Sequence, residues 1–146
     1  MKRYLLILLA CLAAVVSASA QSGRAVARLF TPEFCQKPEV ESVILDGSML
    51  KMTSLDAYRS ISTTDAASIK QMEQLVRLDA QKASSKMLKN SGGHLAYAIL
   101  SYDLSDKQFA YIIFKQFKYN GKDKAVLVYI ESGDSLDVIQ RDVLQK

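Results

Sequence analysis

Three strand-forming segments near the C-terminus constrain the fold more than any other feature of this sequence. They run from Leu95 to Asp103, from Gln108 to Tyr119 and from Lys124 to Glu131, and they are rich in β-branched and aromatic residues. Only Leu104–Lys107 and an Asn120–Gly121 turn separate them. Connections this short join antiparallel neighbours. The sequence therefore predicts a three-stranded antiparallel meander.

Both faces of these strands are apolar at their centres. In the middle segment Tyr111 and Ile113 point one way, while Ile112 and Phe114 point the other. A sheet with one face in water would alternate apolar and polar residues. We therefore expect a helix to cover one face. The N-terminal segment, the final helix or another chain would cover the second.

A long helix is predicted over about Asp65 to Lys89. Its apolar stripe recurs at spacings of three and four residues, as an amphipathic helix requires, and consists of Ile69, Met72, Val76, Ala80, Ala83 and Met87. Thr64 or Asp65 can cap its start, and Asn90 with Gly92–Gly93 can end it. Asp79 interrupts the stripe, so a buried Asp79 would need a partner such as Arg59.

Shorter elements flank this core. They are a short helix over 22–30, a hairpin of Val40–Leu45 and Met49–Met52 around Asp46–Gly47, a strand over 54–62, and a final helix over 135–144 capped by Asp134. The predicted fold class is α+β. In this prediction a long helix packs on an antiparallel β-meander, with an N-terminal β-hairpin and a short C-terminal helix.

The first twenty residues have the features of a secretory signal peptide. Lys2 and Arg3 precede a continuous apolar run, Leu5 to Val16, and Ala18-Ser19-Ala20 supplies the small residues that signal peptidase accepts. The run is short for a membrane span, which needs about 20 apolar residues. We expect cleavage after Ala20 and one domain over 21–146, exported to the periplasm or the cell exterior. An uncleaved anchor is the alternative.

The two cysteines, Cys11 and Cys35, allow few roles. Cys11 lies in the leader, where lipoprotein processing is a further alternative to cleavage after Ala20. With the leader removed, Cys35 has no partner in the chain for a disulfide. Its thiol is then buried and inert, reactive, or paired with the Cys35 of a second chain.

The sequence contains no recognisable catalytic constellation. His94 is the single histidine, so a metal site of several histidines and cysteines is excluded, and a nucleophilic triad would depend on His94 alone. No glycine-rich phosphate loop or dinucleotide fingerprint is present. The net charge of +4 is too small for a strongly basic nucleic-acid binder. We therefore predict no catalytic, cofactor-binding or metal-binding residues and no cofactor.

One cluster of charge and aromatic residues lies around the second hairpin. It consists of Lys115, Lys118, Lys122 and Lys124, with Phe117 and Tyr119 interleaved. Lysines at a hairpin tip commonly discourage edge-to-edge aggregation. An anionic glycan or a lipid head group is the functional alternative.

The order of the segments resembles a family of short exported proteins of unknown function from Bacteroidetes-type bacteria. The segments that carry the resemblance are QLVRLDAQKA at 74–83, GHLAY at 93–97, YIIF at 111–114 and LVYIESG at 127–133. The resemblance covers nearly the whole chain after the leader and implies an exported α+β domain. It implies no catalytic residues.

The function expected from the sequence is that of an exported, non-catalytic binding module. Its partner would be an envelope protein or a glycan, or a second copy of the chain, and not a nucleic acid; no transmembrane segment is expected after cleavage. The alternative is a small-ligand carrier, or an enzyme, with a pocket between helix and sheet.

Overall fold

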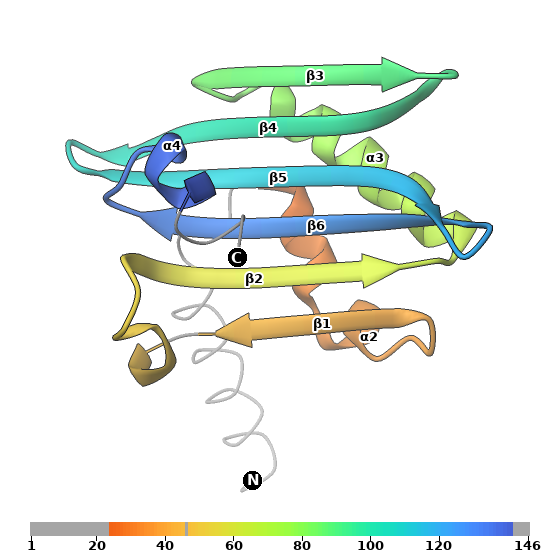
Figure 1. The fold of residues 1–146 in the computed structure, drawn as a ribbon, viewed down its shortest axis with the longest axis horizontal. Coiled ribbons are helices and arrows are strands. Elements are labelled where there is room, and N and C mark those ends of the chain that lie inside the picture. The colour runs from red at the N-terminus through yellow and green to blue at the C-terminus, as the bar shows by residue number, and fades with distance from the viewer. Residues whose placement is uncertain (1–23, 46, 142–146) are drawn as a thin grey trace, which may run out of the picture.

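The dominant feature of the fold is one six-stranded antiparallel sheet, in the order β1-β2-β6-β5-β4-β3 (Figure 1). The computed structural model describes residues 24–45 and 47–141, so the expected signal peptide lies outside the described residues. The strands are β1 (Val40–Leu45), β2 (Leu55–Thr63), β3 (Ser85–Ser91), β4 (His94–Ser105), β5 (Gln108–Tyr119) and β6 (Lys122–Ser132).

The expected meander is confirmed in β4, β5 and β6. Each pairs antiparallel with the next, and Ile113 of β5 lies between Ile99 and Val128. Asn120 and Gly121 join β5 to β6 with φ values of 51° and 79°. Two successive positive φ angles make the tight turn that suits the twist of a hairpin.

The predicted fold class is wrong, because no long helix packs on a meander within residues 24–45 and 47–141. Helix α3 (Ala66–Ala80) ends nine residues before Lys89, and 85–91 form the edge strand β3 instead. The structure is mostly a six-stranded antiparallel sheet with a few short helices. Gly92 and Gly93, expected to end the helix, have positive φ angles in the turn between β3 and β4.

The error at β3 has a physical cause. Every residue of this strand is exposed, so no apolar alternation marks it, and Met87 happens to continue the helical spacing of the residues before it. The strand forms because its backbone pairs with β4, beginning at the hydrogen bond from Ser84 N to Ser101 O (2.8 Å). Such pairing overrides the weak local preference for helix.

The start of α3 follows the prediction. The Asp65 side chain accepts a hydrogen bond from Ser68 N at 3.0 Å and another from Ser68 Oγ at 2.7 Å. The bond from Ser68 N satisfies one of the backbone N–H groups that the first helical turn leaves unpaired.

The predicted N-terminal hairpin is only half right. Strand β1 forms as expected. The strand predicted over 54–62 is also confirmed, as β2. It is β2, and not Met49–Met52, that pairs with β1 in the hairpin. The 3-10 helix η2 (Gly47–Leu50) lies between them, and Asp46 lies outside the described residues.

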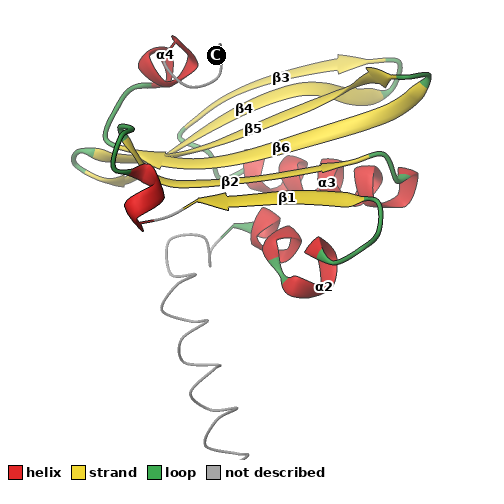
Figure 2. Cartoon of the chain, turned by 60° about the horizontal axis from the view of Figure 1, so that its bottom comes forward, coloured by secondary structure: helices red, strands yellow, loops and turns green. Residues whose placement is uncertain are grey.

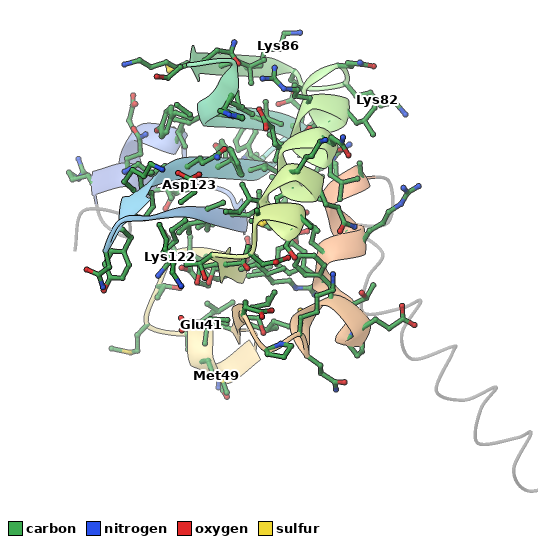
Figure 3. All side chains as sticks on the ribbon, turned by 90° about the vertical axis from the view of Figure 1, so that its right-hand side faces the viewer. Glu41, Met49, Lys82, Lys86, Lys122 and Asp123 are labelled. Carbon is green, nitrogen blue, oxygen red and sulfur yellow. The ribbon has the colours of Figure 1, made fainter. Side chains whose placement is uncertain are left out.

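Helical segments cover both faces of the sheet (Figures 2 and 3). On one face lie α3, the 3-10 helix η1 (Ala25–Phe30) and the short helix α2 (Pro32–Cys35). On the other lie η2 and α4 (Leu136–Ile139). The expectation that both faces need cover is thus confirmed. The predicted final helix forms as α4 and is followed by a π-helical turn at 140–141, but the expected side-chain cap is missing, and 142–146 lie outside the described residues.

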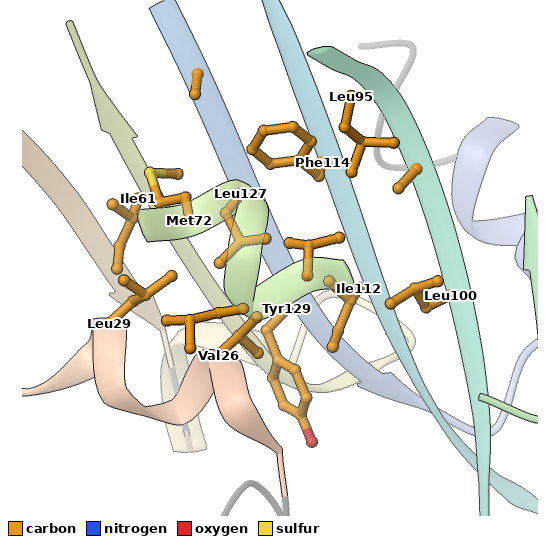
Figure 4. Close-up of a cluster of buried hydrophobic side chains, with 14 of the residues drawn as sticks. Val26, Leu29, Ile61, Met72, Leu95, Leu100, Ile112, Phe114, Leu127 and Tyr129 are labelled. Carbon is orange, nitrogen blue, oxygen red and sulfur yellow. The ribbon is translucent and has the colours of Figure 1, made fainter. Parts of the chain in front are cut away.

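The larger hydrophobic core lies between the sheet and α3 with η1 (Figure 4). Its fully buried side chains include Val26, Leu29, Ile61, Met72, Ile112, Phe114 and Leu127. Burying a side chain of this size contributes about 1.5–3 kcal/mol. A smaller cluster, which includes Ile130 and Ile139, lies on the opposite face.

Asp79 connects the N-terminal segment to α3. It is 4% exposed, and its two carboxylate oxygens accept from Ala25 N at 2.6 Å and from Val26 N at 3.0 Å. The partner that a buried Asp79 requires is therefore the backbone at the start of η1. The backbone oxygen of Asp79 also accepts from the Tyr102 hydroxyl, and Arg24 stacks 3.6 Å from the centre of the Tyr102 ring.

Candidate functional site

A ribbon of two strands extends beyond the six-stranded sheet. The pairing of β4 with β5 ends at Tyr97 and Lys115, and that of β2 with β6 ends at Thr63 and Ala125. Gln116 pairs with Ala125, and beyond this pair residues 117–119 and 122–124 pair only with one another. We call this segment the ribbon; it lies at the end of the sheet that faces the viewer in Figure 3.

A cleft of about 510 Å³ lies between the ribbon, the β3–β4 turn and α3. We call it the helix–ribbon cleft, and its lining residues are Ala66, Ile69, Lys70, Glu73, Gln74, Arg77, Gly93, His94, Gln116 and Asp123. Its volume lies within the range of about 300–1,000 Å³ that is typical of small-ligand sites. Most of its side chains are polar, and they come from segments far apart in the sequence.

A hydrogen-bond network holds the wall of the cleft in place. Glu73 Oε1 accepts from Leu95 N at 2.5 Å and from Arg77 Nη2 at 3.1 Å. Arg77 Nη2 also donates to Asn90 Oδ1 at 2.7 Å. The Glu73 carboxylate therefore links α3 to strand β4, and its charge is already matched by Arg77.

The other polar groups of the cleft differ in how accessible they are to a ligand. Gln116 Oε1 is buried and has no hydrogen-bond partner among the described residues. Lys70 and His94 are exposed at the cleft walls. Asp123 is paired with Lys118 at 2.8 Å on the ribbon, so its charge is compensated.

A second cavity of about 240 Å³ adjoins the cleft and shares His94, Gln116 and Asp123 with it. Ser91 also lines this cavity, so the structure brings together the three residue types of a hydrolytic triad. Within the described ranges, however, no hydrogen bond joins His94 to Ser91 or to Asp123. A triad requires both bonds to orient the imidazole and activate the hydroxyl. The geometry therefore gives His94 no catalytic partner.

Among residues 24–45 and 47–141, no cluster of three or more His, Cys, Asp or Glu side chains could hold a metal ion. No helix in these ranges is long and apolar enough to cross a bilayer.

The lysines predicted to gather at the second hairpin are divided between the two faces of the ribbon. Lys115, Lys122 and Lys124 share one face with Phe117 and Tyr119, whereas Lys118 lies on the other face with Asp123. Cys35 is half-buried at the end of α2, where its thiol donates to Leu29 O at 3.4 Å.

The sequence did not indicate the cleft residues. Lys70 and Gln74 belong to the polar face of an amphipathic helix, and Gln116 follows an ordinary strand. Their convergence depends on the packing of α3 beside the ribbon. The local signal that could have indicated Gln116 is that it is a neutral polar residue within a run of apolar and basic residues.

A comparison with protein families finds a match to a family of unknown function, DUF6108, over residues 13–143. The chain belongs to this family. No curated protein and no solved structure matches the chain. Membership in DUF6108 therefore agrees with the expected resemblance to proteins of unknown function, and it assigns no activity to the cleft.

Proposed function

We propose that this DUF6108 protein is an exported, non-catalytic binding module that holds a small polar ligand in the helix–ribbon cleft. The observation that carries the proposal is Gln116, whose buried Oε1 has no partner among the described residues. Leaving a buried acceptor unpaired costs about 1–3 kcal/mol, so such groups are rare in folded proteins. A ligand donor would reach Oε1 only after the Gln116 side chain turns toward the cleft, and its hydrogen bond would then remove this cost.

The charges of the cleft narrow the chemistry of the ligand. Glu73 and Asp123 are both paired with basic side chains, at 3.1 Å and 2.8 Å. Lys70 lies at the wall and forms no ion pair with another described residue. The site therefore suits a ligand with hydroxyl or amide donors and no more than about one negative charge, such as a monosaccharide, a sugar acid or a short peptide.

Thermal-shift and calorimetric titrations test this proposal. The probes are N-acetylglucosamine, glucuronate and glycylglycine, added to the purified protein. We expect at least one probe to raise Tm in a saturable way. Gln116→Leu should abolish the shift by removing the acceptor, and the free variant should be as stable as the wild type or more so.

Gln71→Leu is the matched control, because it makes the same substitution at an exposed position of α3 outside the cleft. It should leave ligand binding unchanged. The proposal is wrong if no probe binds, or if Gln116→Leu binds as tightly as the wild type. Marked destabilisation of free Gln116→Leu would also contradict it, since the side chain would then support the fold.

The export part of the proposal is supported by the leader features alone: two bases, an apolar run and Ala18-Ser19-Ala20. A C-terminal tag leaves these features undisturbed. We expect the tagged protein outside the cytoplasm, with Gln21 as its first residue by N-terminal sequencing. An intact leader on the exported protein, or retention in the cytoplasm, would overturn this part.

The alternative of an enzyme uses the same cleft and the adjoining cavity. Its support is that Ser91, His94 and Asp123 line one cavity, although no hydrogen bond joins His94 to the other two among the described residues. NMR of the three probes after prolonged incubation with the protein separates the two functions. A binding module leaves the probes unchanged, whereas turnover that is lost in His94→Gln would favour the enzyme.

A further inference from the structure

The face of the ribbon that points away from the helix–ribbon cleft combines aromatic and basic side chains. Phe117 lies directly opposite Lys124, and Tyr119 lies directly opposite Lys122. Directly opposed residues of an antiparallel pair project from the same face. Lys115 lies two residues before Phe117 and so shares this face. We call these five side chains the basic–aromatic face.

The side chains of this face are exposed and partly ordered by one another. Phe117 is 40% exposed and Tyr119 is 53% exposed. The ammonium of Lys124 lies 4.8 Å from the centre of the Tyr119 ring, within the range of a cation–π contact. The Tyr119 ring is therefore held beside positive charge, and Phe117 presents a second exposed ring on the same face.

None of the ion pairs among the described residues involves the lysines of the basic–aromatic face, although Glu39 and Glu41 line a cavity of about 170 Å³ together with Lys124. Within the ribbon the acidic residue is Asp123, and its side chain projects from the opposite face, where it pairs with Lys118. Three lysines thus face solvent together with two aromatic rings. Lys122 and Lys124 are separated by two strand residues, or about 7 Å.

We propose that the basic–aromatic face binds an acidic polysaccharide. Sugar rings present flat apolar faces that pack on exposed aromatic rings, and uronate or sulfate groups along the chain complement the lysines. The narrow, open ribbon suits a polymer that lies across it and continues on both sides. This surface lies on the opposite face of the ribbon from the helix–ribbon cleft, with Phe117 also lining the adjoining cavity, and the proposal does not depend on the proposed function of the cleft.

Two other anionic partners fit the geometry less well. A membrane surface would favour an apolar tip that enters the bilayer, but the tip of this hairpin is Asn120–Gly121. Single-stranded nucleic acid is usually bound in a basic groove that follows the backbone. The basic–aromatic face is one side of a two-stranded hairpin, and the opposite side carries an acidic residue.

Retention on immobilised polysaccharide tests the proposal. The purified protein is passed over polygalacturonate and over neutral dextran, and it is also mixed with vesicles containing 20% phosphatidylglycerol and with a thymidine 20-mer. We expect retention on polygalacturonate alone. Because exposed charges are screened by salt, the affinity should fall several-fold when the ionic strength is raised from about 0.05 M to 0.3 M.

Paired variants separate the two contributions. Phe117→Ser with Tyr119→Ser should weaken polygalacturonate binding about tenfold, through loss of ring stacking. Lys122→Gln with Lys124→Gln should weaken it by a similar factor and reduce the dependence on salt. Lys51→Gln with Lys107→Gln is the matched control, because both lysines are exposed elsewhere. It should bind within twofold of the wild type.

Several outcomes would overturn the proposal. Equal retention on dextran, tighter binding to the vesicles or the 20-mer, or no binding to polygalacturonate each excludes it. So does a control variant that binds as weakly as the ribbon variants. Gln116→Leu should retain polygalacturonate binding, which distinguishes failure of this face from failure of the cleft.

Discussion

The contact between Asp79 and η1 allows a quantitative prediction about how the N-terminal segment is held. Asp79→Ala removes two hydrogen bonds from backbone N–H groups to a buried carboxylate, at 2.6 Å and 3.0 Å. Hydrogen bonds to charged groups contribute about 1.5–3 kcal/mol each. Water that reaches the exposed N–H groups will recover part of this energy. We therefore expect Asp79→Ala to lower the free energy of unfolding by about 3–5 kcal/mol.

The isosteric variant Asp79→Asn should have an intermediate effect. Its amide oxygen can accept from one of the two backbone N–H groups, but its NH₂ group faces the other donor. A loss of about 2–3 kcal/mol is expected, since one hydrogen bond is replaced by two opposed donors.

Urea unfolding followed by circular dichroism measures these losses, because the chain contains no tryptophan. Limited trypsin digestion reports on η1 directly. Arg28 is exposed at this helix, and release of η1 from Asp79→Ala should make cleavage after Arg28 faster than in the wild type.

Asp103→Ala is the matched control, since Asp103 is exposed on β4 and its carboxylate has no described hydrogen bond. It should change the free energy of unfolding by less than about 0.5 kcal/mol. A loss below about 1 kcal/mol for Asp79→Ala, or an equal loss for both variants, would refute the argument that the buried carboxylate holds η1.

Three further predictions concern a turn, a helix cap and buried tyrosines. Gly121 has φ 79°, so Gly121→Ala should cost about 1–2 kcal/mol in urea unfolding, whereas Asn120→Gly should cost nothing. The Ser68 hydroxyl and backbone N–H hold the pKa of Asp65 below its usual value of 3.8; the Tm difference between wild type and Asp65→Ala should therefore be full above pH 4 and shrink as the pH falls further. Burial, reinforced by Asp79 and by Glu131 respectively, raises the pKa of Tyr102 and of Tyr129 above the usual 10.0. These phenols should not affect the free energy of unfolding below pH 10, and they should lower it above pH 10. The fall should be less steep in Tyr129→Phe, and absorbance at 295 nm should show the two phenols ionising on unfolding.

Several elements were predictable because local interactions decide them. Asn120–Gly121 marks its turn because few other pairs accept two positive φ angles. Asp65 marks the start of α3 because its side chain satisfies a nearby backbone N–H. The centres of β5 and β6 are apolar on both faces, and the structure buries both. None of these signals requires knowledge of a distant residue.

Other elements were decided by contacts between residues that are distant in the sequence. The exposed segment at 85–91 becomes a strand because β4 supplies its backbone partners, and β1 pairs with β2 rather than with 49–52. Sequence patterns report burial and turn geometry, and an exposed edge strand shows neither.

The sequence by itself determined the meander, its turn and the start of the helix, because these depend on neighbours within a few residues. Only the tertiary structure decided where the helix ends, the order of the sheet and the candidate sites. Gln116 and Lys70 form one cleft, and the lysines of 115–124 divide between two faces, because of how strands and helix pack together. Chain segments that meet through packing alone leave no local pattern, and this is the physical reason that the cleft could not be predicted from the sequence.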